Sequence, residues 1–387
     1  MKKVVSFSWG ELEADGSNVG DSVILRTQFD AFKKMRIEFG ALSADPKRTG
    51  QRYPGIRCFD VSGGRLKAII RAVKWCDIAV VGGGELVQDV SSLFYTPFNL
   101  LPIFLAFLFR KKSFAWAVGI GQMHELAPLT PLLVRIALRL CSGITVRDRG
   151  SFNVLHRLGF REPEMILAAD SALTLSDYST EAKKSDILGA APRNVLNRSG
   201  KFLPLEIRKK FRNYKEPDPL PAADAWAGIL DAFAGRHHSE IVMFPFHTGS
   251  LSNNDHEFCD LVKSRMNHFS QVRFADPSKP EEFTDLISQC RVFVTAPLHG
   301  AILSVVTGTV PVSVSYASKC SRFMEQAGLE DYLIAGESGI PDKSVTAVVE
   351  RAWMNSESIV QRMIPVRDKL VQRAAKTAEH FRAVFNL

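Results

Sequence analysis

The sequence predicts an α/β protein of two domains, each with a parallel β-sheet covered by helices, and three observations support this prediction. The chain of 387 residues is longer than one hydrophobic core accommodates and suits two domains. In both halves, short apolar segments typical of buried strands alternate with helix-like segments, as in parallel sheets. A polar segment, residues 176–186, interrupts this pattern before it starts again. We therefore expect domains over residues 1–178 and 186–343, and helices over 344–387 that cross back onto the first domain.

In the N-terminal half, strand and helix signals follow one another in order. The first strand, 2–9, leads through a polar loop at 10–21 into a helix. Gly159 is suited to end a later helix, because glycine adopts the left-handed conformation common at that position. The other expected elements are helix 22–35, strands 76–84 and 113–121, helix 131–141, a strand–turn–helix unit at 143–159, and a strand at 164–173.

The same alternation returns in the C-terminal half. Residues 201–221 are an exception, because they are charged, rich in proline and expected to form a surface insertion. The expected elements are strands 187–195, 240–248, 271–277 and 310–316, helices 222–238, 254–266 and 279–290, a strand–turn–helix unit at 291–308, and two helices from about 344 onward.

The composition excludes several classes of protein. Lysine and arginine outnumber aspartate and glutamate by 49 to 41, and the net charge of +8 favours an anionic ligand or surface. Nucleic acid is not an expected partner, because no basic stripe is interleaved with aromatic residues. The six cysteines form no CxxC pair, which is typical of reduced thiols in a cytoplasmic protein. We also find no P-loop, GxSxG, HExxH or DxD sequence, and we expect no bound metal and no cofactor.

One segment, residues 98–112, has an apolar run followed by Arg110, Lys111 and Lys112. The run is well short of the roughly 20 residues that span a bilayer. A buried helix is the favoured interpretation, because short apolar runs usually belong to the core. Alternatively, the segment anchors the protein peripherally at the inner face of a membrane, with its cations against lipid head groups.

The loop after the first predicted strand carries candidate ligand-binding residues. Asn18 and Asp21 suit either a helix cap or a ligand hydroxyl. Gly20 permits close approach of the backbone to another group. The cap and the ligand site are equally good interpretations of this loop.

A second candidate loop starts with three consecutive glycines at residues 82–84, of which Gly83 and Gly84 are the expected ligand contacts. We expect a helix to start here and to offer its free N–H groups to a ligand. Glu85 and Asp89 would then fall one helical turn apart, so both could face the cleft as acceptors or bases for sugar hydroxyls.

Several basic residues stand at the ends of predicted strands, where two facing α/β domains bind ligands. Arg147 and Arg193 could bind an anion, although Arg147 could also pair with a neighbouring carboxylate. Lys319 and Arg322 are further candidates, or simply surface residues. His247, just past a strand, is more simply a loop histidine than a ligand contact.

His299 lies between the predicted strand and helix of residues 291–308. One interpretation is a capping residue in a satisfied core. The functional interpretation is favoured, because His299 stands at the carboxyl end of a strand and opens a helix whose first turn is small and apolar. An imidazole with a pKa of about 6.5 can act as acid and as base at cellular pH. Pro297 fits the turn, where a missing N–H costs little.

Taken in order, several motifs resemble the polysaccharide pyruvyl transferase family. The resemblance spans about residues 17–330 and depends on the order and spacing of the motifs rather than on any one of them. The motifs are NVGD at 18–21, DIAVVGGGELVQD at 77–89, VGIGQ at 118–122, ITVRDRGSFNVLHRLG at 144–159, AADSALTL at 168–175 and LHGAILSVVTGTVPVSVSYASK at 298–319.

The resemblance implies a GT-B-like fold, in which two Rossmann-like domains face each other and C-terminal helices cross back. It also implies transfer of a pyruvyl group from phosphoenolpyruvate to a sugar, usually as a ketal across two hydroxyls. The acceptor would be a unit of a cell-surface polysaccharide, often lipid-linked, bound against the N-terminal domain, with the donor in the C-terminal domain. The implied roles are His299 as catalytic acid and base; Arg193, Lys319, His247, Leu298, Gly300 and Arg147 as donor-binding residues; and Asn18, Gly20, Asp21, Gly83, Gly84, Glu85 and Asp89 as acceptor-binding residues.

The chain departs from the family pattern at Pro297, where many members carry an arginine. A bidentate anion contact of that kind is worth about 1.5–3 kcal/mol. Either another cation compensates, with Arg291, Lys319 and Arg322 as candidates, or the donor is not phosphoenolpyruvate. Two alternatives stay open: a GT-B glycosyltransferase in which His299 positions the diphosphate of a nucleotide sugar, and a non-catalytic protein that binds polysaccharide or an envelope-assembly partner.

Overall fold

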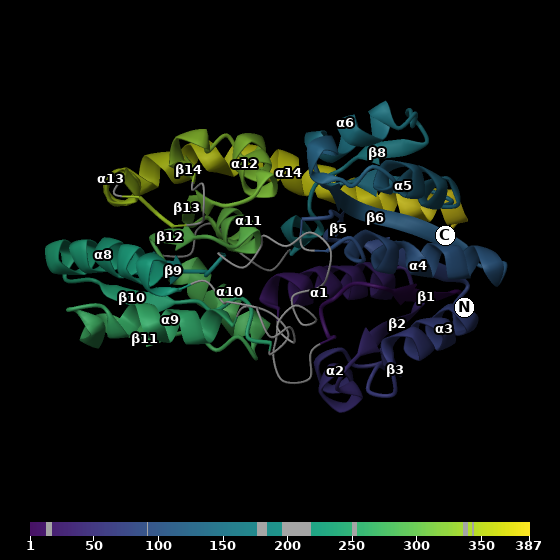
Figure 1. Ribbon diagram of the computed structural model, residues 1–387, viewed down its shortest axis with the longest axis horizontal. Helices are drawn as coiled ribbons and strands as arrows, with labels where there is room; N and C mark the ends of the chain where they lie inside the picture. Colours follow the sequence, from purple (N-terminus) through teal and green to yellow (C-terminus); the bar gives the residue numbers. More distant parts are fainter. Residues whose placement is uncertain are drawn as a thin grey trace.

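The strands of the protein form two separate parallel sheets (Figure 1). The computed structural model describes residues 1–12, 18–90, 92–175, 184–195, 218–249, 254–335, 340–342 and 344–387. Within these residues, the first sheet has the strand order β3-β2-β1-β4-β6-β7-β8, with β5 paired to β6, and the second has the order β11-β10-β9-β12-β13-β14. Helices connect the strands and cover both faces of each sheet. The expected α/β class with two Rossmann-like domains is therefore confirmed.

The first sheet and its helices occupy the N-terminal part of the chain. Its strands are β1 (Lys3–Ser6), β2 (Glu38–Ser43), β3 (Arg57–Asp60), β4 (Ile78–Gly82), β5 (Glu85–Val87), β6 (Lys112–Ile120), β7 (Ile144–Val146) and β8 (Met165–Leu167). Its helices are α1 (Val19–Lys34), α2 (Pro46–Arg52), α3 (Arg65–Trp75), α4 (Tyr95–Leu108), α5 (Thr130–Arg139) and α6 (Arg149–Arg157), with short 3₁₀ turns η1 (Met123–Glu125) and η2 (Ser171–Thr174).

The second sheet and its helices follow. Its strands are β9 (Ile187–Ala191), β10 (Glu240–Met243), β11 (Val272–Phe274), β12 (Val292–Thr295), β13 (Val310–Ser315) and β14 (Leu333–Ala335). Its helices are α8 (Leu220–His237), α9 (Asp255–Ser264), α10 (Pro280–Gln289), α11 (Leu298–Thr307), α12 (Ser318–Gln326) and α13 (Ser344–Met354), with 3₁₀ turns η4 (Phe269–Gln271) and η5 (Glu330–Tyr332).

Strand β6 shows why the central strands read as continuous apolar runs. Successive side chains of a strand point to opposite faces of the sheet, and here both faces are covered. Phe114 and Trp116 pack in the aromatic cluster on one face. Ala115 and Val118 belong to the cluster on the other face, with the inner side of α4. A strand buried on both faces has no position for a solvated polar side chain, so the alternation of polar and apolar residues is lost.

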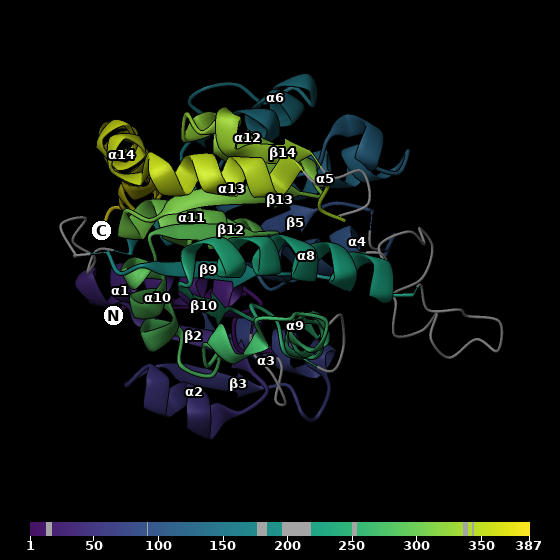
Figure 2. The same ribbon diagram turned by 90° about the vertical axis from the view of Figure 1, so that its left-hand side faces the viewer.

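Helix α14 (Ser356–Phe385) joins the two domains (Figure 1). Its last turns reach the first sheet, where the Phe381 ring lies 5.0 Å from Phe32 and 5.1 Å from Phe114. Helix α13 instead stays on the second domain and lies beside α8 (Figure 2). Both C-terminal helices were expected to cross back, and only α14 does so.

Backbone contacts tie the two domains together beside α1. The Val19 N–H donates to the carbonyl of Phe246 at 2.9 Å, and Asn18 forms an isolated antiparallel bridge with His247. Arg26 of α1 pairs with Glu281 of α10 at 3.1 Å. The carboxyl-end loops of the two domains are therefore in direct contact.

Two expected segments lie largely outside the described residues, namely the linker at 176–186 and the insertion at 201–221. Among the helices that the structure describes, none combines the length and apolar character needed to cross a bilayer.

Candidate active site

The strand order places one point of reversal in each sheet. The chain builds β1, β2 and β3 outward and then returns to place β4 beside β1, and in the second sheet it returns to place β12 beside β9. The loops that follow the two strands at this reversal run to opposite sides of the sheet. They leave a crevice between them at the carboxyl ends of the strands, where ligands bind in this kind of fold. Arg193 follows β9 and His299 follows β12, so both stand at the crevice of the second domain.

His299 crosses the domain boundary to contact α1. It lies in the first turn of α11, after Pro297, whose carbonyl accepts a hydrogen bond from Thr295 Oγ1 at 2.9 Å. A methyl group at Gly20 would come within 2.1 Å of His299 Nδ1. Gly20 therefore makes room for the imidazole, whereas the sequence suggested that it makes room for a ligand. His299 Nε2 is buried and has no hydrogen-bond partner in the described part of the chain.

The environment of His299 keeps its ring neutral. Burial lowers the pKa of His299 to about 4; Asp170 raises it in part, and the charges of Arg147, Lys319 and Arg193 lower it further. At neutral pH the imidazole is therefore uncharged, with one ring nitrogen able to accept a proton and the other carrying an N–H. The pKa of His299 thus lies well below the value of about 6.5 on which the expected acid–base role was based.

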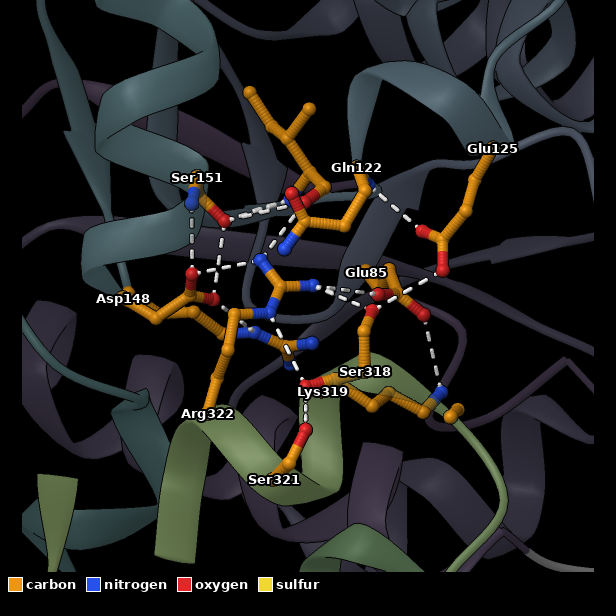
Figure 3. A network of polar contacts seen from close by, with 12 residues as sticks. Glu85, Gln122, Glu125, Asp148, Ser151, Ser318, Lys319, Ser321 and Arg322 are labelled. Atoms are coloured by element: carbon orange, nitrogen blue, oxygen red, sulfur yellow. Dashed lines mark hydrogen bonds and ion pairs between the residues drawn. The ribbon is translucent and has the colours of Figure 1, made fainter. Parts of the chain in front are cut away.

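Glu85 is the centre of an ion-pair network that links the domains (Figure 3). Its carboxylate lies 3.2 Å from Lys319 Nζ and 3.6 Å from Arg322 Nη2, both on α12 of the second domain. Burial would raise its pKa, but Lys319, Arg147 and Arg322 together hold the pKa of Glu85 at about 2. Glu85 is thus ionised and paired with two cations of the second domain.

Arg322 completes this network. Its Nη1 donates to Asp148 Oδ1 at 2.8 Å and to the carbonyl of Ile120 at 3.1 Å. A methyl group at Gly150 would collide with the Arg322 side chain. Ser318, one turn earlier on α12, donates to Glu125 at 3.2 Å (Figure 3). Helix α12 is therefore held against the first domain by charged contacts.

Arg147 follows β7 and keeps one hydrogen-bond donor unused within the described residues. Its Nη1 donates to Asp170 at 3.1 Å, and its Nε lies 3.7 Å from Asp148. Its Nη2 is buried and has no partner among the described residues. A methyl group at Gly119 would come within 2.7 Å of that nitrogen, so Gly119 makes room for the guanidinium. A buried guanidinium N–H without a partner is a candidate anion contact.

Arg193 has a partner of its own. Its Nε and Nη2 both donate to the buried carboxylate of Asp255, and its Nη1 lies 3.5 Å from the Tyr316 hydroxyl. Asp255 also accepts from the backbone N–H of His247 at 3.0 Å. Arg193 and His247 therefore stabilise the loop after β10, and the expected role of Arg193 as a lone clamp on the donor is not what the structure shows.

The glycines of the second candidate loop have a structural role. Residues 85–87 form strand β5, so the helix expected at this point is absent and the expectation is wrong. Gly82 and Gly83 have positive φ values of 143° and 92°, which side chains disfavour. The Gly83 N–H donates to the carbonyl of Trp116 at 2.6 Å and is not available to a ligand.

Asp89 also differs from the expectation. Because no helix connects it to Glu85, the two carboxylates do not share a helix face. Asp89 instead accepts a hydrogen bond from the backbone N–H of Ala127 at 2.7 Å. It thereby ties the segment before α5 to the segment before α4.

A small cavity of about 40 Å³ lies between β1, α1 and β5. Three predicted acceptor residues, Asp21, Gly84 and Glu85, line it. Asn18 lies beside it as the N-cap of α1, and its Nδ2 donates to Asp21 Oδ2 at 2.7 Å. The other lining residues are Ser8, Trp9, Ile24, Gly82, Leu86 and Tyr95.

Two predicted donor residues on α11 are packing residues. Leu298 is buried in the main core of the second domain. The Gly300 N–H donates to the carbonyl of Pro297 at 3.0 Å, and a methyl group there would meet Thr295 Oγ1 at 2.1 Å. The Leu298 side chain and the Gly300 N–H are therefore engaged within the second domain.

Sequence reasoning missed three carboxylates that shape the site: Asp170, Asp255 and Glu125. Asp170 and Asp255 stand at helix starts, where an aspartate is readily explained as a cap. Their cation partners lie far away in the chain, so no local pattern signals the pairing. No cluster of three or more potential metal ligands occurs in the described residues.

The contact between Gly20 and His299 leads to a prediction. Gly20→Ala is compatible with helix α1, yet its methyl group would collide with the imidazole. A displacement of about 1 Å can cost a hundredfold in rate, so we expect kcat/KM to fall by about that factor. Gly228→Ala on α8 is the matched control, because nothing lies within 4 Å of the added methyl group. Equal activities of the two variants, measured side by side, would contradict the contact.

Comparisons with known proteins agree with this architecture. Residues 18–318 match the polysaccharide pyruvyl transferase family. Over 301 residues, the chain is 20% identical to the amylovoran biosynthesis protein AmsJ of Erwinia amylovora, which covers 75% of this chain and 69% of AmsJ.

Solved structures share the fold at low sequence identity. MnaA of S. aureus with UDP is 11% identical with a TM-score of 0.63, over 100% of this chain and 98% of that one. The UDP-GlcNAc 2-epimerase of Neisseria meningitidis is 10% identical with a TM-score of 0.60, over 100% and 99%. HepE of Anabaena with UDP and glucose is 9% identical with a TM-score of 0.57, over 100% of both chains. These likenesses confirm the GT-B-like fold of the chain.

Proposed function

The chain belongs to the polysaccharide pyruvyl transferase family and is a transferase, and we propose that it moves a pyruvyl group from phosphoenolpyruvate onto a sugar. The acceptor that we propose is a unit of a cell-surface polysaccharide or its lipid-linked precursor, by analogy with AmsJ, which is named for amylovoran biosynthesis. One observation carries the proposal: a neutral, unpartnered His299 Nε2 lies in the field of Arg147, Lys319 and Arg193.

The charges of the site suit the donor. Phosphoenolpyruvate carries a phosphate and a carboxylate, and a preorganised positive field lowers the energy of such an anion during reaction. Arg147 Nη2 is the donor contact that we propose, because its buried N–H has no partner among the described residues and its charge acts on His299. Lys319 adds positive charge near His299 from the second domain. These two cations compensate for the arginine that Pro297 replaces.

Arg291, which the sequence suggested as another compensating cation, is placed elsewhere. It stands before the amino end of β12, at the opposite edge of the sheet from His299. There it pairs with Asp186 at 3.2 Å and packs on the ring of Trp353. Arg291 therefore makes no contribution to the crevice.

A neutral imidazole is suited to move the protons of this reaction. In our scheme, His299 accepts the proton of the first sugar hydroxyl, and the imidazolium returns a proton to the methylene carbon of the donor while the sugar oxygen bonds to C2. The second hydroxyl then attacks C2, the bond from C2 to the phosphate oxygen breaks, and phosphate leaves with the second proton. Each hydroxyl thus loses one proton, and the products are a pyruvate ketal and phosphate.

Incubation of the full chain with phosphoenolpyruvate and a sugar that carries two neighbouring free hydroxyls tests the proposal. We expect release of inorganic phosphate that depends on the sugar, and a ketal methyl signal in the proton NMR spectrum of the product. Phosphate release that needs no sugar, or transfer only from UDP- or GDP-sugars, would contradict the proposal. The latter outcome would assign the chain to the nucleotide-sugar alternative.

A further inference from the structure

Helices α4 and α5 expose large apolar side chains on one continuous outer surface of the first domain. The two helices pack against each other and follow consecutive strands of the sheet, which places them on the same face. Leu129 is 78% exposed and Phe107 65% exposed. We call this the α4–α5 surface; its exposed apolar residues are Phe94, Phe107, Leu108, Leu129, Leu132 and Ile136.

The α4–α5 surface is more apolar than packing within the domain requires. No charged residue occurs between Asp89 and Arg110, so α4 carries no charge on any of its sides. Its inner side is buried, with Leu100, Ile103 and Ala106 in the core, as expected of a core helix. A contiguous exposed apolar patch on a folded domain marks a surface that binds a protein or a membrane.

Basic residues border the α4–α5 surface, and they favour a membrane over a protein. Lys74 Nζ lies 5.2 Å from the centre of the Phe109 ring at the end of α4, where Arg110 and Lys112 are exposed. Arg135 is exposed on α5. Arg139, one turn later, lies 3.8 Å from Glu164, which is the acidic neighbour that the ion pairs place at this border. An apolar centre with a basic border is the pattern of surfaces that insert between anionic head groups.

The position of the surface relates it to the crevice. Both helices begin at the carboxyl edge of the sheet, and Phe94 and Leu129 stand at those beginnings. Tyr95, next to Phe94, lines the small cavity beside Glu85 and donates to the Glu85 carbonyl at 3.2 Å. Helix α14 lies on the opposite side of the domain in Figure 2 and leaves the α4–α5 surface uncovered.

We propose that the α4–α5 surface docks on a lipid bilayer that contains anionic head groups, with the apolar side chains at the level of the acyl-chain boundary and the basic border against the lipid phosphates. The crevice then opens beside the membrane, where a sugar carried on a lipid would be presented. Docking requires no spanning segment, because α4 lies in the plane of the interface.

Vesicle co-sedimentation of the full chain tests this proposal without any substrate. We expect binding to vesicles of phosphatidylcholine with phosphatidylglycerol, and binding at least about tenfold weaker to phosphatidylcholine alone, because the basic border contributes through charge. The variant Phe107→Ser/Leu129→Ser should lose at least about tenfold in affinity for the anionic vesicles, because each side chain loses its burial in lipid. The matched control is Phe269→Ser/Met354→Ser, which removes two similarly exposed apolar side chains from the second domain.

Three results would overturn the proposal: no binding to anionic vesicles, equal loss in the test and control variants, or a dimer in light scattering that the test variant abolishes. The last result would assign the surface to a second copy of the chain. Activity on a water-soluble acceptor should be equal in the wild type and in Phe107→Ser/Leu129→Ser. A failure of pyruvyl transfer would therefore leave the vesicle result standing, and the two proposals fail separately.

Discussion

Replacement of His299 by alanine is expected to lower kcat for pyruvyl transfer by about 10²–10⁴-fold, the range that a general acid–base group contributes. The variant should remain folded, because it removes a buried nitrogen that has no hydrogen-bond partner in the described chain. Steady-state phosphate release measures the loss, and the midpoint of thermal unfolding verifies the fold. His268→Ala is the control, since that histidine is partly exposed and pairs with Asp231, away from the crevice.

The pH profile separates catalysis from a structural role for His299. An ordinary histidine produces an acid limb near pH 6.5. Because burial lowers the pKa of His299 to about 4, kcat/KM of the wild type should rise with pH through about 4 and stay level near 6.5. His299→Ala should retain low activity without that limb. A folded His299→Ala with the wild-type kcat would refute the assignment.

The same shift connects stability to pH. Below about pH 6.5 the unfolded chain binds a proton at His299, whereas the folded chain binds it only near pH 4. The neutral His299 therefore contributes to the free energy of unfolding in full above about pH 6.5. This contribution is lost as the pH falls from about 6.5 toward 4. In His299→Ala the free energy of unfolding should depend less on pH within this window.

Replacement of Arg193 by alanine is expected to lower the free energy of unfolding by about 3–5 kcal/mol, because breaking a buried ion pair leaves one charge without its partner. Asp255 is fully buried and would keep only its hydrogen bonds from the loop, including the one from the His247 N–H. That loop bridges to Asn18 of the first domain, so the contact between domains should loosen as well. Urea unfolding followed by circular dichroism measures the change.

Two further variants sharpen the Arg193 experiment. Arg265→Ala breaks an exposed pair with Asp224 and should lower the free energy of unfolding much less than Arg193→Ala does, because solvent screens the pair. The double variant Arg193→Ala/Asp255→Ala removes both charges and should recover part of the stability, because no uncompensated carboxylate remains. If Arg193→Ala proves no more destabilising than Arg265→Ala, the pair is not the structural element that its geometry indicates.

The candidate site shows where prediction from the sequence succeeds. His299 was placed at the carboxyl end of a strand and the start of a helix, and it lies there, in the first turn of α11 just after β12. Arg147 was placed at a strand end and follows β7. The ends of strands and helices can be predicted from the apolar periodicity of a few neighbouring residues, which is visible in the sequence itself.

The same residues show where prediction from the sequence fails. Three consecutive glycines indicated a helix start, but Gly82 and Gly83 serve a turn into β5 against Trp116. Nothing in the sequence indicated a partner for Glu85, but α12 of the other domain supplies two cations to it. In each case the deciding neighbour lies far away in the chain.

By itself, the sequence determined the α/β class, the family and the position of each candidate residue at a strand end, because these follow from local periodicity and from the order of short motifs. Only the tertiary structure decided which of these residues are engaged and which are free. Lys319 and Arg193 are occupied by Glu85 and Asp255, whereas His299 Nε2 and Arg147 Nη2 are left without partners among the described residues. Partners that are distant in sequence meet only when the two domains pack, and the same packing removes the water that would keep the pKa of His299 ordinary.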